Sequence, residues 1–285
     1  MKKFFKTTLI VLIILLALFL LVEGRMFIMA KSVGYKTLKV FAYYKNTEVS
    51  EALDSFQTQH FIVKNRGASG DMAEELGNLL EKSYNLIGKE FDYFPAKKTP
   101  VFIYGSMEEF WKKNKSLEGQ AIMGLYHMGI IHLVVPEVFN MDLHEFENNG
   151  PVLHEYTHKV IDDLSNGNME IWFTEGMALF QEYKQYGNEW ARGMEFDDEY
   201  TMEQLRDDFM ILESVQAYKQ SFEIVKDIYK NHGKEKILEL LSELRKGNDM
   251  DSAFFHIYRE DLRKRKKALD LLRSKPFFSI RGDTK

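Results

Sequence analysis

The stretch Pro151-Val152-Leu153-His154-Glu155-Tyr156-Thr157-His158 carries the strongest signal in this chain of 285 residues. On a helix, residues four positions apart lie on the same face, so the imidazoles of His154 and His158 point the same way. Two neutral imidazoles form half of a tetrahedral zinc site. Glu155 lies beside the first histidine and can take the proton of the attacking water as general base. The pattern predicts a zinc-dependent hydrolase.

The residues around this motif predict that a third metal ligand lies on a second helix. Pro151 suits the first turn of a helix, and Ser165-Asn166-Gly167-Asn168 ends it. A further helix is predicted from Trp172 to Tyr186, stopped by Gly187. It carries Glu175 near its start, which places this carboxylate well for the third position in the metal site.

Composition restricts the chemistry of such a site. The chain has no cysteine, which excludes disulfides, a cysteine nucleophile and thiolate ligands, so a metal site must use histidine and carboxylate. This ligand set suits zinc and also admits manganese or cobalt. The net charge of −5 does not suggest nucleic acid as a partner. A hydrophobic content of 45% suffices for a proper core.

The amino terminus has the pattern of an export segment. Lys2, Lys3 and Lys6 precede an apolar run from Thr7 to Val22. Because a cleavage site is poorly represented, we favour a retained anchor over residues 1–24, with secretion after signal cleavage as the alternative. Lysines before the run place the amino terminus inside and the remainder outside the membrane. Residues 25–57 are then a juxtamembrane spacer, and the catalytic segment is extracytoplasmic.

The rest of the chain predicts strands first and helices afterwards. Strands are expected at Gln59–Val63, Pro100–Tyr104 and Gly129–Pro136. Helices are expected at 71–89, 106–114, 151–164, 172–186, 212–231, 234–246 and 251–258, with Asp71 capping the first of them. This order is typical of an α+β fold in which a small mixed sheet with helices precedes a mostly helical half. The domain is expected to cover residues 58–260.

With these motifs in place, the chain resembles the gluzincin superfamily of metallopeptidases, specifically the peptidase MA-like domains found in many bacterial proteins. The resemblance is specific at His154-Glu155-Tyr156-Thr157-His158 and at Trp172-Phe173-Thr174-Glu175-Gly176-Met177-Ala178. It is only suggestive at Ala217-Tyr218-Lys219-Gln220-Ser221-Phe222 and at Asn231-His232-Gly233-Lys234-Glu235-Lys236-Ile237. It implies a zincin-like fold behind the N-terminal membrane helix.

The resemblance also implies the roles of the site residues. His154, His158 and Glu175 hold Zn²⁺, and Glu155 is the general base. Tyr218 matches the position of an aromatic hydroxyl in the family, although a half-buried core tyrosine explains it equally well. Many members carry an acidic residue four positions after the third ligand, where this chain has Leu179. The residue that orients a histidine must then be Asp162, Asp163 or Glu182, or it is absent.

The predicted function is that of a membrane-anchored, extracytoplasmic zinc metallopeptidase. The strand Gly129–Val135 would line the cleft and hold an extended peptide by strand addition, so that the substrate is a peptide or protein. The alternative is a weak or inactive module that binds a peptide or an envelope component. His127 and His132 are interpreted as ordinary strand histidines. The basic tail, residues 261–285, is a solvated helix end or contacts anionic lipid or wall polymer.

Overall fold

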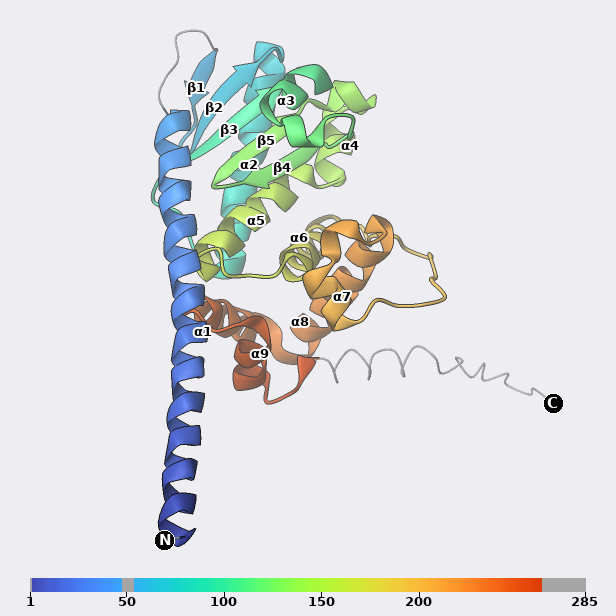
Figure 1. Cartoon of the computed structure of the whole chain (residues 1–285). Helices are drawn as coiled ribbons and strands as arrows, with labels where there is room; N and C mark the ends of the chain where they lie inside the picture. Colours follow the sequence, from blue (N-terminus) through green and yellow to red (C-terminus); the bar gives the residue numbers. More distant parts are fainter. Residues whose placement is uncertain (1, 48–53, 263–285) are drawn as a thin grey trace, which may run out of the picture.

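The structure is a computed structural model that describes residues 2–47 and 54–262 (Figure 1); most side chains before residue 30 also lie outside the description. The strands are β1 (Ser55–Gln57), β2 (Phe61–Arg66), β3 (Thr99–Tyr104), β4 (Gly124–His127) and β5 (Ile130–Val134). The helices are α1 (Lys2–Thr47), α2 (Gly70–Phe91), α3 (Met107–Lys113), α4 (Leu143–Asn148), α5 (Pro151–Ser165), α6 (Ile171–Tyr186), α7 (Met202–Asp207), α8 (Ser214–Arg245) and α9 (Met250–Tyr258). Short 3-10 helices are η1 (Lys115–Leu117), η2 (Pro136–Phe139) and η3 (Phe209–Ile211).

The strands form one mixed sheet in the order β1-β2-β3-β5-β4. The inner pairs β2–β3 and β3–β5 are parallel, whereas the outer strands β1 and β4 run antiparallel to their neighbours. Every described element after β5 is helical. The predicted α+β class, with a small mixed sheet followed by a helical half, is confirmed.

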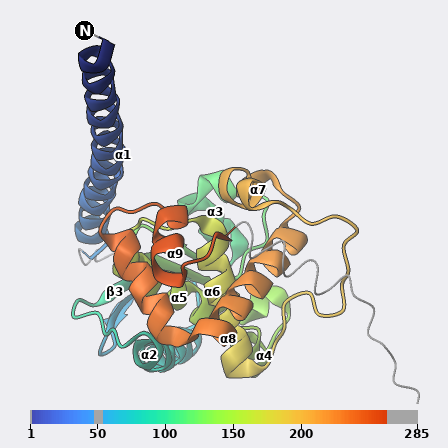
Figure 2. The ribbon, with the colours of Figure 1, turned by 90° about the horizontal axis from the view of Figure 1, so that it is seen from below.

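Helices cover both faces of the sheet. The larger core joins one face of β2, β3 and β5 to α2 and α5, and it continues among the C-terminal helices. On the other face, Phe102, Tyr104 and Val134 pack with Phe110 of α3. α5 occupies the centre of the molecule because it contacts α2 and β4 on the sheet side and α6 and α8 on the helical side (Figure 2).

Local signals set the ends of the two helices that carry the motifs. Pro151 is the first residue of α5, and Asn166 ends this helix in the left-handed conformation. Gly187 ends α6 with φ 77°, as its sequence predicts. α8 is interrupted at Gly233, which lies between the two helices expected from the sequence. The cap of α2 is Ser69 and not Asp71, because the Ser69 hydroxyl accepts from the Met72 N–H.

α1 is a single helix that stands beside the domain and extends beyond it at the amino terminus (Figure 1). The predicted spacer, residues 25–57, contains the second half of this helix and the strand β1. Within the described part of the chain, no helix is long and apolar enough to cross a membrane. Of the anchor predicted at residues 1–24, most side chains lie outside the description, and so do residues 263–285 of the basic tail.

Candidate metal centre

Three predicted ligands from two helices meet in the centre of the molecule. Glu175 Oε2 lies 3.1 Å from His154 Nε2 and 3.4 Å from His158 Nε2. One potential ligand atom from each residue lies within 4.8 Å of the other two. In a tetrahedral site with bonds of about 2.0–2.1 Å, neighbouring ligand atoms lie about 3.3 Å apart. The His-His-Glu group is therefore close enough to bind one metal ion.

A tight contact between α6 and α8 places Glu175. A Cβ atom on Gly176 would lie 2.3 Å from the backbone oxygen of Ser221, so only glycine permits this approach. The same approach brings Tyr218, one turn before Ser221, next to the metal ligands. The hydroxyl of Tyr218 lies near the carboxylates of Glu175 and Glu155, and both charges raise its pKa. Tyr218 is thus part of the site in addition to packing against Trp190 and Phe209.

Both histidines have a polar partner on the ring nitrogen that faces away from the metal position. His154 Nδ1 lies 2.5 Å from Glu182 Oε1, and His158 Nδ1 lies 2.7 Å from the Thr174 hydroxyl. Such partners set the tautomer and the orientation of a ligating imidazole. Of the three acidic residues considered from the sequence, Glu182 takes this position, two turns after Glu175 on the same face of α6. Asp162 and Asp163 lie at the far end of α5, and Thr174 was not anticipated.

We expect Glu182→Gln to lower metal affinity by about 10–100-fold, because the amide no longer raises the basicity of His154. Titration of the purified protein with zinc and a competing chelator measures this change. Glu189→Gln is the matched control, since it removes an ion-paired carboxylate on the surface, 2.7 Å from Lys226. Equal zinc affinity in the Glu182 variant and in the wild type would contradict a role of Glu182 in the metal centre.

Burial and neighbouring charges tune the ionisable groups of the centre. Burial raises the pKa of Glu155, and the Glu175 charge adds to this, whereas the histidines oppose it. Burial also acts to raise the pKa of Glu175, but the charge of His158 and hydrogen bonds from both histidines hold it far below its usual range. For His154, hydrogen bonds with Glu175 and Glu182 outweigh burial and raise its pKa well above the ordinary value. Protons therefore compete with a metal ion for His154.

The strand β4 covers the carboxylate of Glu155. The Tyr126 backbone N–H lies near this carboxylate and acts to lower its pKa. A Cβ atom on Gly124 would lie 2.7 Å from Glu155 Cγ and 2.9 Å from Oε1. β4 is the outer strand of the sheet, whereas β5 pairs on both sides with β3 and β4. The expectation that the strand at Gly129–Val135 accepts a peptide by strand addition is therefore wrong, because its hydrogen-bonding groups are already used within the sheet.

If Glu155 is the general base that the sequence predicts, Gly124→Ala should lower turnover by at least about tenfold, the effect of roughly 1.4 kcal/mol of lost transition-state stabilisation. The added methyl group displaces Glu155 and leaves the metal ligands in place. Steady-state kinetics together with metal analysis measures both effects. Gly70→Ala is the control, because Gly70 has open space around it and, like Gly124, does not adopt a positive φ. Normal turnover in Gly124→Ala would contradict the proximity of β4 to the working position of Glu155.

The remaining histidines of the sheet have other roles. His132 is buried and its Nδ1 lies 2.7 Å from the Tyr104 hydroxyl. Burial lowers its pKa to about 3, so it is neutral at physiological pH. His127 is exposed on β4 and belongs to no metal group within the described residues. Their interpretation as ordinary strand histidines agrees with these positions.

Comparison of the chain with models of protein families and with curated proteins finds no significant match.

Proposed function

We propose that this protein is a zinc-dependent peptidase of the gluzincin type. The observation that carries the proposal is the combination of a candidate His-His-Glu ligand group with a buried carboxylate, Glu155, that is not one of the three candidate ligands and interacts with all of them. A purely structural metal site has no need of such a base. Two imidazoles and one carboxylate leave one of four tetrahedral positions for water, which is the ligand set of catalytic zinc sites.

Each residue of the site has its own role in the proposed reaction. When bound, zinc supplies a Lewis acid that polarises a carbonyl and lowers the pKa of water. Glu155 accepts a proton from the attacking water and delivers it to the leaving amine, and its raised pKa brings it closer to neutral pH. Glu182 and Thr174 hold the imidazoles in the orientation that ligation requires.

Tyr218 is positioned to donate to the oxyanion of the tetrahedral intermediate. Burial raises its pKa, as do the charges of Glu175 and Glu155, so the hydroxyl stays protonated at neutral pH. A neutral phenol can turn from Glu175 to a negative oxygen that develops at the reacting carbon.

We expect Tyr218→Phe to lower kcat by about 10²–10³-fold, the cost of one oxyanion donor, with little change in zinc content. Tyr183→Phe, which keeps an aromatic ring on α6 and loses a hydroxyl away from the metal, is its control. An unchanged kcat in Tyr218→Phe would show that Tyr218 only packs in the core and does not donate to the oxyanion.

The proposed substrate is an extended peptide that pairs with β4. β4 is one of the two outer strands of the sheet, and its Gly124 and Tyr126 lie against Glu155. Backbone pairing at such an edge gives affinity for a peptide chain with little dependence on its side chains. It also places a scissile amide beside the base. This arrangement supports a peptide or protein as substrate in preference to a small ester.

We further propose that residues 1–24 anchor the protein in a membrane with the domain on the extracytoplasmic side. The support is the apolar run Thr7–Val22, which three lysines precede and which continues into the rest of α1. The basic tail, residues 261–285, would then contact anionic lipid or wall polymer. Full-length protein should remain with membranes through an alkaline carbonate wash. Release by that wash would contradict the anchor.

The decisive experiment is a cleavage screen with the full-length, zinc-loaded protein and a peptide library. We expect new amino termini to form, and their formation to stop with a chelator and resume when zinc is restored. Zinc binding at one ion per chain without cleavage of any peptide would support the alternative, a binding module of the same fold. Absence of metal binding would contradict both.

A further inference from the structure

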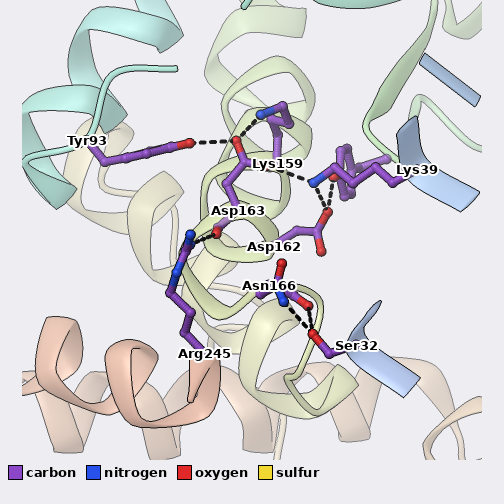
Figure 3. Close-up of polar contacts among 9 residues, drawn as sticks. Ser32, Lys39, Tyr93, Lys159, Asp162, Asp163, Asn166 and Arg245 are labelled. Carbon is purple, nitrogen blue, oxygen red and sulfur yellow. Dashed lines mark hydrogen bonds and ion pairs between the residues drawn. The ribbon is translucent and has the colours of Figure 1, made fainter. Parts of the chain in front are cut away.

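The carboxyl end of α5 meets α1 in a buried cluster of charges. Lys39 Nζ of α1 lies 2.5 Å from Asp162 Oδ2 and 2.7 Å from Asp163 Oδ1 (Figure 3). Asp162 has no exposed surface. Its carboxylate therefore depends on protein groups to replace water, and Lys39 is the cation in direct contact with it.

Several contacts hold α1 in this place. Asp163 also accepts from the Tyr93 hydroxyl at 3.0 Å and pairs with Lys159 (Figure 3). The Ser32 hydroxyl donates to the Asn166 backbone oxygen at 3.0 Å. A cavity of about 320 Å³ beside these residues is lined by both α1 and the domain. The second half of α1 is thus docked onto the helix that carries the metal motif.

A single residue of β4 connects this cluster to the proposed active site. The hydroxyl of Tyr126 donates to Asp162 Oδ2, the oxygen that Lys39 also contacts. The backbone N–H of the same residue lies near the Glu155 carboxylate. Gly124 of the same strand packs against Glu155, because a Cβ atom there would lie 2.7 Å from Glu155 Cγ. Glu155 and Asp162 lie two turns apart on one face of α5. β4 is therefore held against α5 at two points, one on the general base and one on the charge that α1 neutralises.

We propose that Lys39, Asp162 and Tyr126 are positioning residues for Glu155, so that docking of α1 holds the general base in its working place. The inference rests on the proposed function for the role of Glu155. It makes the second half of α1 part of the catalytic unit, although Lys39 contacts Asp162 and Asp163 and these are not among the candidate metal ligands.

The charge of Lys39 is essential in this arrangement. Burial acts to lower the pKa of Lys39, but Asp163 and Asp162 outweigh it and raise the pKa above the ordinary value, so the side chain stays charged. Without it, Asp162 is a buried carboxylate that accepts from the Tyr126 hydroxyl, with the charge of Lys159 nearby. Removing one member of a buried ion pair is strongly destabilising for the charge that remains. The carboxylate must then turn toward water, and Tyr126 loses its partner.

The test compares full-length variants in kinetics, zinc content and hydrogen exchange of the Tyr126 amide. Lys39→Met removes the charge, and Tyr126→Phe removes only the hydroxyl. We expect both to lower kcat by about tenfold or more, to leave KM and zinc content unchanged, and to speed exchange of the Tyr126 amide by at least about tenfold. Lys39→Arg should restore part of kcat. Lys31→Met, at an exposed lysine of the same helix, is the control and should behave as the wild type.

A double variant separates positioning from a loss of folding. Lys39→Met with Asp162→Asn removes both charges, so no unpaired charge remains buried, and Tyr126 keeps an acceptor. We expect its kcat and amide exchange to lie closer to the wild type than those of Lys39→Met. If Lys39→Met lowers kcat only to the extent that it also lowers the zinc content or the fraction of folded protein, the inference is overturned.

The exchange measurement distinguishes failure of this inference from failure of the proposed function. If the wild type cleaves no peptide but Lys39→Met still speeds exchange at Tyr126, the coupling from α1 to Glu155 stands and the peptidase assignment fails. If the wild type is active and both kcat and exchange are unchanged in Lys39→Met and Tyr126→Phe, the coupling is wrong and the peptidase assignment remains.

Discussion

Glu155→Gln should lower kcat by about 10²–10⁴-fold, the contribution of a general base, while the protein keeps its metal. The amide has nearly the same shape as the carboxylate, so it fits the same space against β4. It has no basic oxygen that takes a proton from water. Because Glu155 is not among the three ligands, its replacement leaves the metal group intact. Kinetics and metal analysis on the same preparation measure both quantities.

Two outcomes would contradict the role of Glu155. Turnover within a few-fold of the wild type would show that another group takes the proton. Loss of metal together with activity would show that Glu155 supports the ligands and is not a base. Glu145→Gln is a suitable control, because this carboxylate lies in α4 and is exposed.

His158→Ala should abolish both stoichiometric metal binding and turnover. Alanine removes one of three ligands and leaves a gap in a buried position, so two remaining groups must hold the ion. The loss of zinc affinity should exceed the roughly 10–100-fold expected for Glu182→Gln, because Glu182 only orients the ligand His154 and does not itself bind the metal. Elemental analysis after removal of excess zinc gives the stoichiometry. One zinc per chain in the variant would contradict the assignment of the site.

The amount of zinc that the protein retains should depend on pH in a defined direction. Hydrogen bonds to carboxylates outweigh burial and raise the pKa of His154, so protonation displaces metal at a higher pH than for an ordinary histidine. Zinc retention should therefore fall as the pH is lowered. His144→Ala, at an exposed histidine of α4, should follow the wild-type curve and controls for the loss of a histidine in general.

The metal ligands could be predicted from the sequence because their geometry is local. His154 and His158 lie on one helix at a spacing that puts both imidazoles on the same face. Glu175 follows on the next helix after a short loop, and a short connection keeps two consecutive helices adjacent in space. The ends of these helices also depend on local signals, namely Pro151, Asn166 and Gly187. The α+β class could be predicted for the same reason, because the spacing of apolar residues that distinguishes strands from helices is also local.

The sequence left β4 unrecognised for a physical reason. β4 is a short strand, Gly124–His127, whose residues show no long alternation of apolar and polar side chains. Its identity as a strand depends on pairing with β5. The assignment of the peptide-binding edge to the Gly129–Val135 strand failed for the same reason, since an unrecognised neighbour makes an inner strand look like an edge.

The sequence by itself predicted the three candidate metal ligands, the proposed base and the order of sheet and helices, because each depends on residues close together in the chain. The tertiary structure alone decided which acidic residue supports His154, which strand covers Glu155, and that α1 docks onto α5. Glu182, Asp162 and Asp163 were indistinguishable in sequence as partners for a histidine. They differ only in what packs against them, with His154 next to Glu182 and Lys39 next to Asp162. Contacts between residues so far apart depend on how whole elements pack, which no local pattern encodes.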